Sequence, residues 1–175
     1  RSSDLGAGDE PDEGRLTAAF AACADAAAPY GLSADLEFMP WTAVPDAATA
    51  QRIVERSGAA NGGVLVAALH VARSTTRLAD LAAIPPRLLH YAQICDAPAA
   101  IPATGEEMIF DARCRRLLPG DGGIDLAGIF ARLPADLPVS VEIPNEAGKS
   151  EIGVQAWAAA AIARARRVLG QPSAG

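Results

Sequence analysis

The chain has 175 residues, of which 50% are hydrophobic and 21% are charged, with a net charge of −6 and a pI near 4.9. This length suits one domain with a substantial core, and no apolar run is long enough to cross a bilayer. An acidic chain lacks the basic face that binds a nucleic-acid backbone. We therefore expect a single domain over residues 1–175, with no nucleic-acid partner and no membrane partner. We also expect a flexible loop at 1–12 and a flexible tail at 170–175.

The three cysteines favour neither a disulfide scaffold nor a zinc ribbon. Cys23, Cys95 and Cys114 are an odd number, and no two of them form a Cys-x-x-Cys pair. Cys23 lies among alanines in a helical pattern, which is typical of a small core residue. The polar, acidic N-terminus does not resemble a signal peptide, so we expect a reducing, cytoplasmic setting.

The first part of the chain alternates helical patterns with one apolar run. Residues 13–30 repeat apolar side chains at helical spacing, which predicts the first helix. Residues 35–41 are a short apolar run with Glu37 in its middle, which predicts a buried strand. Asp46 is suited to cap the next helix, which ends near Gly58.

The middle of the chain continues this alternation. Residues 64–70 are continuously apolar, as expected of a strand that is buried on both faces, and residues 74–83 predict a short helix. Residues 88–96 predict the next strand. Residues 97–125 read as a long loop, and a loop of that length in a compact domain is usually functional.

The last part of the chain predicts a helix at 126–133, a strand at 138–144 that holds Glu142, and a closing helix at 152–169. Four βα units of this kind predict a parallel α/β fold. An open sheet would normally carry a phosphate-binding glycine loop, and neither G-x-G-x-x-G nor G-x-x-x-x-G-K-[ST] is present. The alternative is half of a (β/α)₈ barrel, which needs about 250 residues when complete.

Glu37 and Glu142 are the first candidate site residues. A carboxylate inside an apolar strand is unfavourable unless a metal, a cation or a hydrogen-bond network takes up its charge. Parallel strands end at one edge of the sheet, so the two side chains are expected to share one site. The structural alternative is that each carboxylate pairs with an arginine at the rim.

Five segments in this order carry a resemblance. They are Asp35–Trp41 (DLEFMPW), Gly63–His70 (GVLVAALH), Gln93–Ala97 (QICDA), Arg116–Gly122 (RLLPGDG) and Ser140–Pro144 (SVEIP). Together they resemble the sugar phosphate isomerase/epimerase family, the xylose isomerase-like TIM barrels. The resemblance implies a (β/α)₈ barrel of which this chain supplies strands five to eight, with the N-terminal half absent.

The resemblance also implies a metal site at the carboxyl ends of the strands. Glu37, Gln93 and Glu142 match three of the four ligands, and Gln93 has the form found in enzymes that resemble 3-dehydroshikimate dehydratases. The fourth ligand is an Asp three residues before His70, where this sequence has Ala67. Carboxylate and amide oxygens suit hard divalent cations, so the expected cofactor is Mn²⁺, Mg²⁺ or Zn²⁺.

The same resemblance places His70 and Arg116 beside the substrate. A histidine can protonate a leaving hydroxyl, and an arginine fork can hold a substrate oxygen. We therefore predict Glu37, Glu142 and His70 as catalytic residues, with Arg116 and Trp41 contacting the substrate. Asp96 is either a partner of the site or a loop cap. We assign no role to His90.

These residues favour a metal-dependent isomerase or epimerase that moves protons through an enediolate of a polyhydroxylated carbonyl substrate. The partner is then a small polyol or keto-sugar, and we expect a homo-oligomer. One alternative is a dehydratase of the 3-dehydroshikimate or inosose type. An apurinic-site endonuclease needs several metals and many histidines, whereas this chain has two histidines. Ala67 favours a third alternative, a degenerate barrel that binds a ligand without catalysis.

Overall fold

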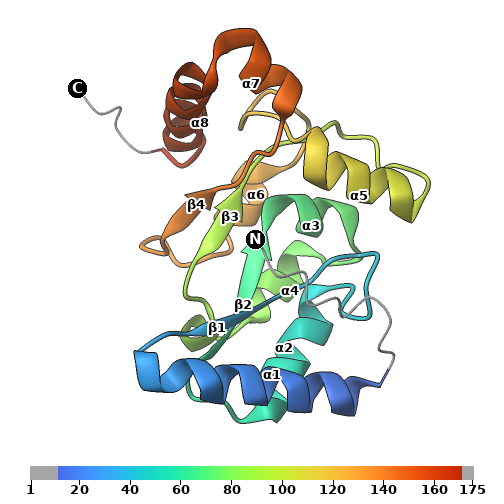
Figure 1. Cartoon of the computed structure of the whole chain (residues 1–175), viewed down its shortest axis with the longest axis vertical. Helices are drawn as coiled ribbons and strands as arrows, with labels where there is room; N and C mark the ends of the chain where they lie inside the picture. Colours follow the sequence, from blue (N-terminus) through green and yellow to red (C-terminus); the bar gives the residue numbers. More distant parts are fainter. Residues whose placement is uncertain (1–11, 171–175) are drawn as a thin grey trace.

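Four parallel strands form one sheet in the order β1-β2-β3-β4 (Figure 1). The structure is a computed structural model that describes residues 12–170. The strands are β1 (Ala34–Glu37), β2 (Gly62–Ala67), β3 (Ala92–Ile94) and β4 (Val139–Val141). The predicted parallel α/β fold is confirmed. Apart from Asp12 and Gly170, the predicted loop at 1–12 and tail at 170–175 lie outside the described residues.

Helices connect and flank the strands. They are α1 (Glu13–Ala27), α2 (Ala47–Ser57), α3 (Ala68–Arg73), α4 (Leu78–Ala83), α5 (Gly105–Cys114), α6 (Leu126–Phe130), α7 (Glu146–Ile152) and α8 (Val154–Val168), with 3₁₀ turns η2 (Ala28–Tyr30) and η3 (Pro86–Leu88). The predicted cap of α2 is confirmed, because Asp46 accepts a hydrogen bond from the Thr49 amide at 2.9 Å. Among residues 12–170, no helix is both long and apolar enough to span a membrane.

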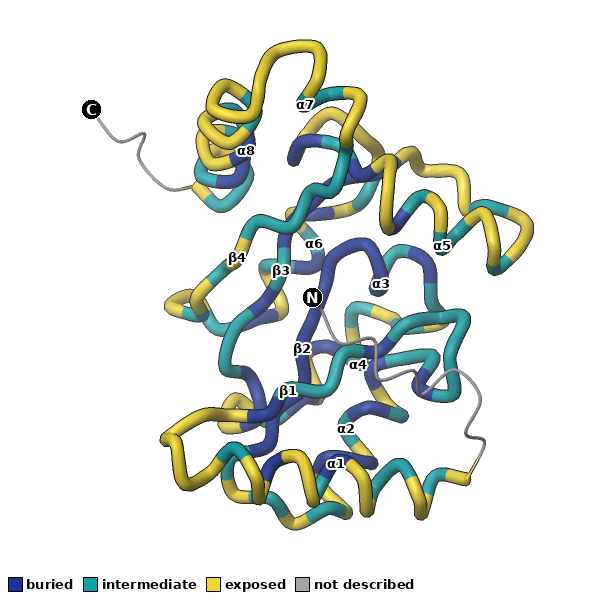
Figure 2. The backbone as a smooth tube through the Cα atoms, in the orientation of Figure 1, coloured by how far each residue is buried: buried dark blue, intermediate teal, exposed yellow. Residues whose placement is uncertain are grey.

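The core lies on one face of the sheet. Val64, Val66, Ala92 and Ile94 are almost fully buried and pack in one cluster with six α-helices. The α-helical members of that cluster are Phe20, Ala24, Ala47, Ala50, Ile53, Val54, Ala68, Val71, Leu81, Leu126, Ile129 and Ala165. Every residue of β2 is buried, as its continuous apolar run predicts. Figure 2 shows β2 and α3 as the most buried stretch, whereas α5 and α8 are largely exposed.

All four strands are shorter than expected, and β1 and β4 cover only part of the predicted 35–41 and 138–144. β2 ends at Ala67 and the chain turns at once into α3, so His70 lies on a helix and not in a strand. The predicted strand at 88–96 is a regular strand only over β3, because η3 occupies its beginning. Short apolar runs do not by themselves distinguish a strand from a buried helical turn, and α3 is such a turn.

Two helical predictions also need correction. The segment 97–125 is not one loop, because a capping box starts α5: Thr104 Oγ1 accepts from the Glu107 amide, and Glu107 Oε2 accepts from the Thr104 amide, both at 3.2 Å. The predicted closing helix at 152–169 corresponds to α8, whereas α7, which ends at Ile152, was not predicted. Gly153 separates the two helices, and its φ of 85° favours glycine. Cys23 is exposed and not a core residue, since α1 packs through Phe20 and Ala24 instead.

Candidate active site

The strand register places the predicted site residues on one face of the sheet. Glu37 pairs with Leu65, and two residues further along β2, Ala67 pairs with Gln93. Gln93 in turn pairs with Ser140. Because successive strand residues point to opposite faces, these five side chains share a face, opposite the helix-covered core. The carboxylate, the alanine and the amide are therefore neighbours across the strands.

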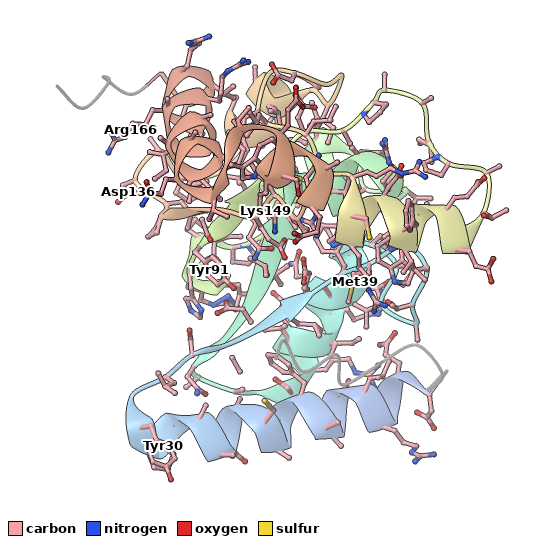
Figure 3. The ribbon with its side chains drawn as sticks, turned by 45° about the horizontal axis from the view of Figure 1, so that its top comes forward. Tyr30, Met39, Tyr91, Asp136, Lys149 and Arg166 are labelled. Carbon is pink, nitrogen blue, oxygen red and sulfur yellow. The ribbon has the colours of Figure 1, made fainter. Side chains whose placement is uncertain are left out.

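Glu142 extends the same row beyond β4. Its amide donates to Ile94 O at 3.2 Å, so the ladder continues through Glu142, which lies two residues after Ser140 and thus on the same face. Burial raises the pKa of Tyr91, and the carboxylates of Asp35, Glu37 and Glu142 raise it further. Glu37 and Glu142 therefore both lie within electrostatic reach of Tyr91, which Figure 3 labels beside the sheet.

Glu37 faces the imidazole of His70. His70 Nε2 lies 3.3 Å from Glu37 Oε1, and His70 is only 2% exposed. Trp41 stands edge-on to the imidazole, with ring centroids 5.2 Å apart and planes at 76°. Three predicted site residues therefore lie together: Glu37 at the end of β1, Trp41 shortly after it, and His70 on α3.

Arg116 faces the other glutamate. Its Nη1 donates to Glu142 Oε2 at 2.5 Å, and its Nε donates to Ala112 O at 2.8 Å. The backbone of Arg116 is fixed as well, because its carbonyl accepts from Asn145 Nδ2 at 3.0 Å. Arg116 is 5% exposed, so the charge of this buried guanidinium is balanced by Glu142.

Two of the predicted metal ligands have a side-chain oxygen that accepts no hydrogen bond from the described residues. Glu37 Oε1 and Gln93 Oε1 are buried and have no hydrogen-bond partner within residues 12–170. Buried acceptors of this kind are rare and call for an explanation such as an ion. In the same part of the chain, however, no three His, Cys, Asp or Glu side chains gather closely enough to hold a metal. The donor set therefore fits a cation only with the Gln93 amide included, and Ala67 contributes no donor.

Asp96 is buried and holds the loop that follows α5. Its carboxylate accepts from the amides of Ala97, Gly120, Gly122 and Ile124 at 2.8–3.1 Å. Its backbone also exchanges two hydrogen bonds with Leu117. Of the two roles considered from the sequence, the loop cap is the one in the structure.

The pairing of Asp35 with His90 is a feature that the sequence reasoning missed. His90 Nδ1 lies 2.8 Å from Asp35 Oδ1, and Ser33 donates to the other oxygen at 3.1 Å. A Cβ at Gly63 would overlap Asp35 Oδ1 and lie 2.7 Å from His90 Nδ1, so the glycine makes room for the pair. The available signal was Gly63 at the start of the strand, because a glycine in a strand often marks a close approach of another group.

The chain matches the model of a known family. The family model described as the xylose isomerase-like TIM barrel matches residues 2–168. The chain belongs to this family. The resemblance found in the sequence is therefore confirmed, whereas the assignment to strands five to eight of the barrel remains a prediction.

Solved structures of this family share the fold. IOLI protein with a bound zinc atom has a TM-score of 0.76 and 21% identity, over 90% of this chain and 56% of that one. A xylose isomerase-like TIM barrel/4-hydroxyphenylpyruvate dioxygenase fusion protein has a TM-score of 0.69 and 26% identity, over 78% and 22%. D-allulose 3-epimerase from Methylomonas sp. has a TM-score of 0.58 and 19% identity, over 79% and 46%. The chain thus spans less than two thirds of each, and no curated protein matches it.

Proposed function

We propose that this xylose isomerase-like chain carries the site of a divalent-metal-dependent isomerase or epimerase that acts on a polyhydroxylated carbonyl compound. The observation that carries the proposal is the pairing of each glutamate on the shared sheet face, Glu37 with His70 and Glu142 with Arg116. Two carboxylates that flank one space, each beside a group able to share or balance its charge, suit proton transfer to and from carbon. The epimerase and the zinc-bound protein among the structural neighbours support this class of chemistry.

In the proposed mechanism, a substrate lies across the face that Glu37, Gln93 and Glu142 share. One glutamate removes the proton from the carbon beside the carbonyl, and a proton is returned at the neighbouring carbon or from the opposite face. Arg116 holds Glu142 in a fixed orientation, and Trp41 forms a wall of the site. A Mn²⁺, Mg²⁺ or Zn²⁺ ion held by Glu37, Gln93 and Glu142 would polarise the carbonyl and stabilise the negative charge that develops on the substrate.

Two other functions each have one observation in their favour. A dehydratase of the 3-dehydroshikimate or inosose type is favoured by Gln93, and it would use His70 to protonate the departing hydroxyl. A ligand-binding barrel without catalysis is favoured by Ala67, because it removes a donor from the expected ligand set.

All three candidate functions can be tested by following the exchange of a carbon-bound substrate proton with deuterium from D₂O. We expect the protein, supplied with Mn²⁺, Mg²⁺ or Zn²⁺, to exchange the proton beside the carbonyl of a ketose or inosose, as followed by NMR. Glu142→Gln should slow exchange by a factor on the order of 10²–10⁴, the typical contribution of a positioned acid or base. Glu106→Gln, on the exposed face of α5, is the matched control.

Each outcome of this experiment separates the candidates. Exchange with retention of all hydroxyl groups supports the isomerase or epimerase. Loss of water from the substrate, or from 3-dehydroshikimate, supports the dehydratase instead. Binding of these compounds with no exchange under any metal condition would leave the degenerate binding barrel.

A further inference from the structure

The starting point is the unusual contact between His70 and Glu37. Their nearest atoms, Nε2 and Oε1, are 3.3 Å apart, yet Glu37 Oε1 has no hydrogen-bond partner among the described residues. A hydrogen bond between an imidazole N–H and a carboxylate would be shorter, about 2.7–2.9 Å. The observed separation is longer than such a bond, and a cation bound to both atoms would account for it and for the unpartnered oxygen.

The separation matches that of two ligands on one metal ion. Nitrogen and oxygen ligands lie about 2.1 Å from zinc. Two such ligands are therefore about 3.0 Å apart at a right angle and about 3.4 Å apart at a tetrahedral angle. The observed 3.3 Å lies within that interval without any movement of either side chain.

The imidazole is also held in place for this role. His70 is 2% exposed, lies in the first turn of α3 and stands edge-on to Trp41. Its Nδ1 is buried and has no partner within residues 12–170, so packing rather than a hydrogen bond orients the ring. The nitrogen that faces Glu37 is Nε2.

Ala67 explains why a further ligand is needed. It lies level with Gln93 on the site face, three residues before His70, and offers no donor atom. We propose that His70 Nε2 takes the ligand position that Ala67 leaves without a donor, so that a divalent transition metal is held by an imidazole nitrogen together with Glu37 and the Gln93 amide oxygen. This inference rests on the proposed function and deepens it.

The proposal has a chemical consequence for the choice of reaction. A nitrogen bound to a metal has no proton to give, so His70 no longer protonates a leaving hydroxyl. That favours isomerisation or epimerisation over dehydration. An imidazole ligand also favours Zn²⁺ over Mg²⁺ and Mn²⁺, which prefer oxygen ligands.

X-ray absorption of the zinc-loaded protein tests the proposal directly, because imidazole ligands give a characteristic scattering pattern. The chain has two histidines, so each can be removed separately. We expect the imidazole pattern in the unmodified protein and in His90→Gln, and its loss in His70→Gln. Zinc affinity, measured by competition with a chromophoric chelator, should fall at least 10- to 100-fold in His70→Gln, the loss typical of a residue that merely orients a ligand.

A double variant guards against a folding defect in His70→Gln. Ala67→Asp combined with His70→Gln supplies an oxygen ligand in place of the nitrogen, and should restore zinc affinity without the imidazole pattern. An all-oxygen zinc site in the unmodified protein, an imidazole pattern that persists in His70→Gln, or no zinc binding at all would each overturn the proposal.

Failure of this inference and failure of the proposed function are distinguishable. Hydrogen exchange in a protein whose zinc has only oxygen ligands leaves the proposed function standing and removes the role of His70. An imidazole-bound zinc in a protein that exchanges hydrogen on no substrate supports the inference and contradicts the proposed function.

Discussion

Arg116 connects the segment after β4, which holds Glu142, to the end of α5. Its guanidinium contacts Glu142 after β4 and the Ala112 carbonyl of α5, and its backbone is bonded to Asn145 and Pro144. The sequence left open whether the glutamates serve function or pair with arginines at the rim. For Glu142 the pair with arginine exists, and it lies on the same face as Glu37 and Gln93.

Replacement of Arg116 by lysine tests whether this geometry matters for activity. Lysine keeps the charge but cannot donate to Glu142 and Ala112 at once, so the carboxylate loses its fixed orientation. A charge-assisted hydrogen bond contributes about 1.5–3 kcal/mol, so we expect kcat/KM to fall about 10- to 100-fold. Steady-state kinetics measure this effect.

The neighbouring Arg115→Lys is the control for this change. Arg115 lies over the Phe110 ring at 4.3 Å and its side chain is 65% exposed, outside the site. Its substitution should leave kcat/KM within about twofold. Equal losses in both variants would indicate that Arg116 acts only through general stability.

At the level of elements, the loop between α5 and α6 depends on one buried carboxylate. The Asp96 carboxylate accepts hydrogen bonds from three backbone amides of this loop and from the amide of Ala97. Its backbone also pairs with Leu117, the residue after Arg116. Loops of this length are otherwise among the mobile parts of a domain. Here the loop is fixed to the end of β3, and it carries Arg116 with it.

Substitution of Asp96 by asparagine should destabilise the protein. Asparagine retains one acceptor oxygen and loses the charge, so several of the four amides lose their partner. We expect the free energy of unfolding to fall by about 2–4 kcal/mol, measured by urea denaturation. Gly122→Ala should act in the same direction, because its Cβ would overlap Ala97 O and Asp96 Oδ1.

Asp125→Asn is the control for the Asp96 prediction. Asp125 caps α6 by accepting from the Gly128 amide at 2.9 Å, and it is exposed. Asparagine is as good an N-cap as aspartate, so a change below about 0.5 kcal/mol is expected. A loss at Asp96 no larger than this would contradict its role in holding the loop.

For the whole molecule, the buried thiol of Cys95 is expected to lower the free energy of unfolding as the pH becomes alkaline. Burial raises the pKa of Cys95, and the negative charge of Glu142 adds to this while Arg116 opposes it. A raised pKa in the folded state means that the stabilisation is complete below the thiol pKa of the unfolded chain, about 8.5. It is lost as the pH rises from there through the pKa of the folded state.

Denaturant unfolding at pH 7.5, 8.5 and 9.5 measures this dependence. The unmodified protein should lose more stability across the series than Cys95→Ala, which has no thiol to ionise. Cys114→Ala removes an exposed thiol and should follow the unmodified protein. Identical pH profiles for all three proteins would show that Cys95 is not protected from ionisation in the fold.

Much of this architecture could be predicted from the sequence, for physical reasons specific to each part. The helix that Asp46 caps and the buried strand through Val64–Ala67 follow from local side-chain chemistry. The start of α3 does not, because apolar residues continue unchanged from strand into helix across Ala67. α5 was also missed, since its capping box lies in a polar stretch without apolar periodicity.

The candidate site residues could be named from the sequence, whereas their side-chain pairings could not. Glu37 and Glu142 stood out as carboxylates within apolar strands, whereas Gln93 was named through the family resemblance. The strand register places all three on one face. Their partners depend on tertiary geometry: His70 enters through a helical turn and Arg116 through a loop fixed by Asp96. No local pattern in the sequence reports such contacts.

The strand register has one more consequence. From Glu37 to Gln93, the position along the strands advances by two residues over two strands, and Glu142 lies two residues further still on the next strand. A (β/α)₈ barrel has a shear of about one residue per strand, which tilts its strands against the axis. In a complete barrel with this register, a diagonal line across the sheet would run nearly level around the axis, and Glu37, Gln93 and Glu142 would lie at similar heights along it.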